Sequence, residues 1–148
     1  MTRQNTKSGF TLIELTIVIA ILAVTAYFGT AYFTSFSTRA SLDSTSKRIS
    51  SYLQQARSKS MAQEDGKAWE IRFGKDASGD FYQLCWEDGD CQAKIYLPSE
   101  VKFKDNIEGK KIQFTKLYGS LSENSTIDKV KLSSSKVETL NIIYVNKE

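Results

Sequence analysis

The organisation of this 148-residue chain is decided by residues 7–15, which read Lys7-Ser8-Gly9-Phe10-Thr11-Leu12-Ile13-Glu14-Leu15. They join a short basic leader to a long apolar stretch that contains one charge, Glu14. A carboxylate inside a membrane-length apolar segment costs several kcal/mol unless it is neutralised, so such a residue is by default functional. Cleavage after Gly9 would free the amine of Phe10, a cation close enough to pair with the Glu14 carboxylate.

This motif resembles the type IV pilin superfamily, which comprises the pilins, pseudopilins and minor pilins of type IV pili, type II secretion and DNA-uptake machines. Gly9 matches the residue before the cleavage point, and Phe10 matches the new N-terminus, which the family usually N-methylates. Glu14 matches the acidic fifth residue of the mature chain. The resemblance implies cleavage by a prepilin peptidase, assembly with other pilin-like subunits through Phe10 and Glu14, and contact with inner-membrane assembly machinery and lipid.

The apolar run allows one competing interpretation, a secretory signal peptide. Such a peptide is cut after its apolar region at small residues, and Ala23–Ala26 offers a site of that kind. The motif at Gly9 and Phe10 favours cleavage before the apolar run, so we expect the helix to stay in the mature protein.

Glu14 itself has two interpretations. In the first, its carboxylate pairs with the Phe10 amine of a neighbouring subunit and sets the axial register of a filament in a low-dielectric core. In the second, it stabilises the dipole of a helix from the first turn and lies at the level of the lipid headgroups. The family context favours the assembly contact.

The segment from Leu12 to Phe36 is nearly free of charge and holds roughly 25 residues, enough to cross a bilayer core of ~30 Å. Arg3 and Lys7 precede it and should keep the N-terminus in the cytoplasm, so the C-terminal domain is expected outside. We therefore expect a leader over residues 1–9 and a transmembrane and assembly helix over 10–36. No proline precedes Pro98, which leaves Gly29 as the one candidate for a soft point where the family often has a kink.

Helical periodicity continues over residues 37–65, although the composition becomes polar. Apolar residues at spacings of three, four and seven predict one buried stripe on this amphipathic continuation, formed by Leu42, Ile49, Tyr52, Leu53 and Ala56. The helix should end near Gln63–Gly66, where Glu64-Asp65-Gly66 is typical of a stop and turn.

After Gly66 the hydrophobic period becomes two, as in a strand: Trp69, Ile71 and Phe73 alternate with Glu70 and Arg72. A turn at Ser78–Asp80 should lead into the next strand. The further expected strands are Phe81–Trp86, Cys91–Leu97 (with Cys91, Ala93, Ile95 and Leu97 inward), Val101–Phe103, Lys111–Phe114, Ile127–Leu132 and Thr139–Val145. The predicted fold class is α+β: a long N-terminal helix, transmembrane in its first half, packed on a mostly antiparallel sheet in a β-rich extracytoplasmic domain over 66–148.

Cys85 and Cys91 are the two cysteines of the chain. If Glu87-Asp88-Gly89 forms a three-residue hairpin loop with Gly89 left-handed, the two cysteines face each other at a non-hydrogen-bonded pair. An extracytoplasmic location then favours a disulfide over two free buried thiols.

Two other clusters could bind ligands. Glu87, Asp88 and Asp90 could suggest calcium, but three carboxylates on a tight hairpin are more often a solvated turn, so we expect no metal. A lysine run interleaved with aromatic residues could bind DNA phosphates, and it comprises Lys102, Lys104, Lys110, Lys111 and Lys116. Because acidic residues interrupt this run, we expect strand lysines on one outward face and no DNA partner.

Composition narrows the function further. The formal net charge is +3, and loss of a leader that holds Arg3 and Lys7 and no acid leaves +1, which gives no general argument for acidic partners. The chain has no His, and no nucleophile has an evident base, so we expect neither an enzyme nor a cofactor.

The second half of the chain is similar to the H-type minor pseudopilins and related minor pilins. The similarity rests on Leu53–Ser60, Leu97–Val101 and Ile112–Phe114 followed by Gly119, although the terminal Gly-Arg common in that group is absent. It implies a minor pseudopilin that is assembled into a short filament for type II secretion. The alternatives are a minor pilin of a type IV pilus or competence filament and, in another class, a membrane-anchored module that binds DNA or a secreted substrate.

Overall fold

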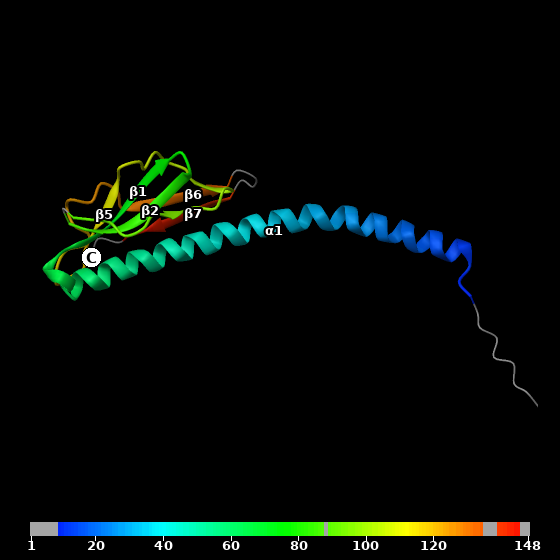
Figure 1. Cartoon of the computed structure of the whole chain (residues 1–148), viewed down its shortest axis with the longest axis horizontal. Coiled ribbons are helices and arrows are strands. Elements are labelled where there is room, and N and C mark those ends of the chain that lie inside the picture. Colours follow the sequence, from blue (N-terminus) through cyan, green and yellow to red (C-terminus); the bar gives the residue numbers. More distant parts are fainter. Residues whose placement is uncertain (1–8, 88, 135–138, 146–148) are drawn as a thin grey trace, which may run out of the picture. The chain divides into compact units, whose positions relative to one another are not determined.

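The computed structural model describes residues 9–87, 89–134 and 139–145 (Figure 1). In these residues one long helix, α1 (Leu12–Met61), is followed by a short 3-10 turn (Glu64–Gly66) and seven strands. The chain divides into two compact units, Met1–Phe36 and Ser37–Glu148, and α1 contributes to both. The fold is α+β, a long N-terminal helix with antiparallel sheets packed on it, as the sequence predicts.

In the first unit, the helix begins at Leu12 because Thr11 caps it. The Glu14 N–H donates to Thr11 Oγ1 at 3.3 Å, which satisfies one of the amide groups left free at a helix N-terminus. From there α1 continues without interruption through position 29, so Gly29 does not break the helix.

The end of α1 lies where the sequence places it. Gln63, Asp65 and Gly66 adopt left-handed backbone angles, with φ of 51°, 58° and 66°. The returning chain is tied to the helix by Ser60, whose Oγ accepts a hydrogen bond of 2.8 Å from the Trp69 N–H. This bond fixes the start of β1 against the last turns of α1.

Two antiparallel sheets form the rest of the second unit, where the sequence pattern predicts one. The first has the order β3-β2-β1-β5, from β1 (Trp69–Asp76), β2 (Gly79–Trp86), β3 (Ile95–Tyr96) and β5 (Lys111–Gln113). The second has the order β4-β6-β7, from β4 (Val101–Phe103), β6 (Lys129–Ser134) and β7 (Leu140–Tyr144). Figure 1 shows the strands of this unit gathered over the second half of α1.

Two strand predictions need correction. Gly79 pairs with Asp76, so the β1–β2 loop is Ala77-Ser78 and Gly79 and Asp80 belong to β2, not to the turn. The expected strand Cys91–Leu97 is reduced to the two residues of β3, and Ala93 is exposed rather than inward.

The short β3 and the exposed Ala93 result from a change of register. Cys91 pairs with Cys85 and Ile95 with Tyr82, so the second strand has one residue more between the two pairing points than β2 has. An extra residue of this kind forms a bulge and inverts the alternation beyond it.

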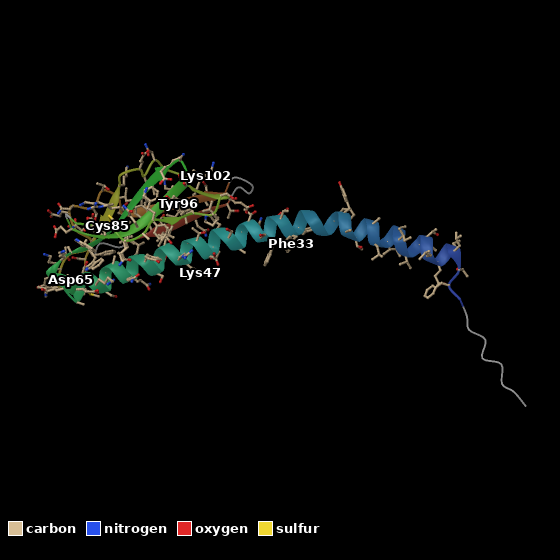
Figure 2. All side chains as sticks on the ribbon, viewed as in Figure 1. Phe33, Lys47, Asp65, Cys85, Tyr96 and Lys102 are labelled. Atoms are coloured by element: carbon tan, nitrogen blue, oxygen red, sulfur yellow. A yellow bond between two sulfur atoms is a disulfide. The ribbon has the colours of Figure 1, made fainter. Side chains whose placement is uncertain are left out.

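The core lies between α1 and the two sheets. All five residues of the predicted helical stripe take part: Leu42, Ile49, Leu53 and Ala56 are buried, and Tyr52 packs against them. Thr38, Thr45 and Ser60 are buried as well. The stripe is therefore longer than its apolar residues indicate. On the other side of α1, Lys47 (labelled in Figure 2) is exposed and pairs with Asp43 at 2.7 Å.

Glu70 departs from the simple alternation of β1. Its side chain is 0% exposed, although the sequence pattern places it outward. It lies opposite Cys85 in β2 and Gln113 in β5, both buried. Its carboxylate is neutralised by Arg72 and by Lys111 Nζ, which lies 2.9 Å from Oε2. The outer face of this sheet thus buries a paired charge.

Candidate assembly site at the helix N-terminus

Gly9 and Phe10 lie just before α1 and are exposed, Phe10 to 84%. A Cβ built at Gly9 would meet nothing within 4 Å. The fold of this chain therefore does not require glycine at position 9. A requirement for glycine there would come from a protein that acts on this segment.

Glu14 occupies the third position of the helix, and Thr11 is its cap. Thr11-Leu12-Ile13-Glu14 thus has the form of a capping box, Thr-x-x-Glu, a signal that the sequence contains but that was not among the sequence-based predictions. The side chain of Glu14 is exposed, and it makes no ion pair with any described residue. The carboxylate is therefore accessible to a group from outside the chain, so this geometry accommodates both interpretations of Glu14.

The helix that follows presents a continuous apolar surface. α1 is the one helix in the described chain that is long and apolar enough to cross a membrane, and its most apolar window is not buried by the protein. The large side chains from Leu12 to Phe36, including Phe33 (labelled in Figure 2), are exposed. Such a surface is stable in lipid or against other helices.

These features match a known targeting and processing signal. Residues 4–26 match the prokaryotic N-terminal methylation motif. No curated protein and no solved structure matches the chain. The motif supports membership of the type IV pilin superfamily and indicates a pilin-like subunit that is processed by a prepilin peptidase, anchored through its apolar helix and assembled with other pilin subunits.

The disulfide prediction is confirmed. Cys85 and Cys91 are bonded, with 4.1 Å between their Cα atoms. They form an isolated antiparallel bridge, and the Gln92 N–H donates to the Leu84 carbonyl at 2.8 Å, which is the pattern beside a non-hydrogen-bonded pair.

The left-handed conformation expected of Gly89 stays a prediction, because its φ depends on the position of the preceding residue, Asp88. What the structure requires there is space: a Cβ at Gly89 would overlap the indole of Trp86. Asp88, the centre of the expected loop, lies outside the described residues.

The lysine run is divided between the two sheets. Lys102 is in β4 and Lys104 follows it, whereas Lys111 is in β5, which belongs to the other sheet. Lys111 is paired with Glu70, and Lys116 lies 3.9 Å from Glu87. Lys102 and Lys104 share a hollow with Asp80, Asp105 and Glu108. No continuous basic track results from this arrangement.

Of the three acidic hairpin residues, Glu87 and Asp90 lie among the described residues and Asp88 does not. Among the described residues no group of three or more His, Cys, Asp and Glu side chains could hold a metal ion. Glu87 lies near Lys116, and both side chains are partly exposed, as expected of a solvated turn.

Three ionisable groups outside the apolar half of α1 have shifted pKa values. Burial raises the pKa of Tyr82 to about 12, and its hydroxyl has no partner in the described structure. A hydrogen bond of 2.8 Å from Lys94 lowers the pKa of the exposed Asp76 carboxyl and raises that of Lys94. All three groups belong to the second unit, and we assign them to structure rather than to function.

Proposed function

We propose that the chain is a minor pseudopilin of a type II secretion system. It is cut after Gly9, N-methylated at Phe10 and assembled into a short filament in which it has no catalytic activity of its own. The observation that supports it best is the methylation motif followed by an apolar helix that no part of the described protein covers. The H-type resemblance of Leu53–Ser60 and of the later strands supports secretion over the other machines.

In this proposal the leader is cytoplasmic, the segment 10–36 lies in the inner membrane, and the β-rich domain is extracytoplasmic. Arg3 and Lys7 support this orientation through the positive-inside rule. The disulfide agrees with it, because such bonds persist in oxidising compartments. A minor pilin of a type IV pilus or competence filament would share every one of these features.

Gene deletion distinguishes the machines. Loss of the gene should abolish export of a secreted protein if the chain is a pseudopilin, with surface pili and DNA uptake unchanged. Loss of pili or of transformation, with normal secretion, would assign the chain to the alternative filaments.

Glu14 can be tested with a matched set of variants. The assembly interpretation predicts that Glu14→Gln and Glu14→Ala both reduce incorporation into the filament, while Thr11→Ala, which removes only the helix cap, leaves incorporation nearly unchanged. The macrodipole interpretation predicts that all three variants are incorporated nearly as the wild type, since loss of an exposed charge at a helix N-terminus costs only about 0.3–1 kcal/mol. Incorporation is measured by crosslinking to wild-type subunits after equal membrane insertion has been verified.

A further inference from the structure

The two sheets have four edge strands, and three of these edges are short and protected against pairing. At β5 the outward groups are those of Lys111 and Gln113. Their N–H groups donate to Thr126 Oγ1 at 2.7 Å and Ser125 Oγ at 2.9 Å. Their carbonyls accept from the N–H groups of Thr126 and Ser122 at 3.0 and 2.8 Å. No strand can be added there without displacing these bonds.

The edges at β4 and β3 are protected in other ways. The outward N–H groups of β4 belong to Val101 and Phe103, and they donate to the Pro98 carbonyl at 2.9 Å and to Asp80 Oδ2 at 3.0 Å. β3 is only two residues long, and Pro98 follows soon after it. Short edges and nearby prolines are common protections against unwanted pairing.

The edge at β7 differs from these three. Val145 donates to the Asp128 carbonyl at 2.8 Å, so by alternation along the ladder the N–H and C=O groups of Leu140, Ile142 and Tyr144 point away from β6. Within the described chain these outward groups make no hydrogen bond. β7 has five residues, and none of them is charged or is proline.

The side chains of the same three residues form an exposed apolar row. Leu140 is 40% exposed, Ile142 37% and Tyr144 68%. An open edge with apolar side chains is the usual template for addition of an extended peptide: backbone bonds supply affinity, and alternate side chains supply specificity.

A groove of about 320 Å³ lies at the Tyr144 end of this edge. Its lining includes Leu53 and Arg57 of α1, Phe114, and Ile143 to Val145. Arg57 is the one charged residue of the lining, and it makes no ion pair with any described carboxylate. The rest of the lining is part polar and part apolar, so a groove with this guanidinium fits a carboxylate on a partly apolar ligand.

We propose that β7 is a docking edge for an extended segment of a partner protein, a segment with alternating apolar residues and an acidic residue. The segment adds to the second sheet as a strand beside β7, and its carboxylate pairs with Arg57 in the groove. Because Leu140–Tyr144 itself contains no acid, the charge on Arg57 favours a partner of different sequence over a second copy of this strand. The inference rests on the sheet edges and holds for whichever filament the chain joins.

The test uses the full chain in detergent micelles and a fluorescent synthetic peptide in which Val and Thr alternate between two terminal Glu residues. Two matched peptides accompany it: one with alternate backbone amides N-methylated, and one with Gln in place of Glu. Saturable binding of the first peptide is expected, weakened about tenfold or more, or by at least 1.4 kcal/mol, by N-methylation. The Gln peptide should also bind more weakly.

Variants of the protein separate the two contacts. Ile142→Pro removes an outward donor without removing a bond to β6, so it should weaken binding as N-methylation does, whereas Ile142→Thr keeps the donor and should bind nearly as the wild type. Arg57→Gln should reduce affinity for the Glu peptide to that for the Gln peptide. Thermal melts show that each variant is folded.

Three outcomes would overturn the proposal. They are no binding of the Glu peptide, binding that N-methylation and Ile142→Pro leave unchanged, and a chain that dimerises by light scattering and becomes monomeric on Ile142→Pro. The last result would assign the edge to a second copy.

Discussion

The two halves of α1 have the same backbone but opposite surfaces. From Leu12 to Phe36 the large apolar side chains are exposed, while from Thr38 to Ser60 one stripe of the helix is buried against the sheets. The second half of α1 is held by the two sheets of its own chain. The first half has no such partner in the described protein; its exposed apolar surface suits lipid or other helices, in agreement with the methylation motif at its start.

The largest effect is expected from truncation of the buried stripe. Ile49 is fully buried, so Ile49→Ala should lower the free energy of unfolding of the domain by roughly 2–5 kcal/mol. Ile17→Ala is the control in the exposed half and should leave the melting temperature of the domain unchanged. Thermal denaturation of the full chain in detergent measures both, and equal effects would contradict the division of α1.

Loss of the disulfide should come next. The loop between Cys85 and Cys91 is short, so changing both residues to Ala should cost about 2 kcal/mol, the low end for disulfides. The loss should appear in denaturant unfolding of the domain and leave membrane insertion of the first half intact. Peptide mapping without reduction checks the bond directly, and two alkylatable thiols in the native protein would refute it.

Glu70→Gln tests the buried carboxylate. Arg72 and Lys111 would lose their common anion, but both are about a third exposed and can be hydrated. The expected loss is therefore roughly 1–2 kcal/mol, less than that for breaking a fully buried pair. Denaturant midpoints of Glu70→Gln and of the double variant with Lys111→Gln should show that the two changes are not additive.

The smallest effect is expected at Tyr82. Its hydroxyl is buried and without a partner in the described structure, so Tyr82→Phe removes an unsatisfied group and keeps the ring that packs on Tyr52. The unfolding free energy should be unchanged or slightly higher. A loss above about 1 kcal/mol would show that the hydroxyl has a partner, such as an internal water.

The sequence predicted the features that depend on local pattern. The processing motif, the length of the helix, its stop at Gln63–Gly66, the positions of most strands and the disulfide all follow from nearby residues. The buried stripe was predicted only in part, because Thr38, Thr45 and Ser60 are polar residues on a buried face. The cap at Thr11 was not predicted, because Glu14 was interpreted as an isolated charge and not as the end of a Thr-x-x-Glu spacing.

The predictions that were wrong concern features that depend on pairing between distant segments. Lys102 and Lys111 lie in different sheets, and no local period reveals this division. The extra residue between Cys91 and Ile95 shortens β3, and it too becomes evident only when this segment is paired with β2. Glu70 is buried because its cross-strand neighbours Cys85 and Gln113 are buried, and register of this kind is set by the whole sheet.

The central claim is that residues 7–15 are a processing and assembly signal, and the intact mass of the membrane-extracted protein tests it most directly. We predict a chain that begins at Phe10 and carries one added methyl group, and an uncut chain in cells that lack prepilin peptidase. Gly9→Val should also remain uncut, although the fold itself has open space at that position. A mature chain that begins after Ala26, or an unprocessed Met1 in cells with the peptidase, would contradict the account.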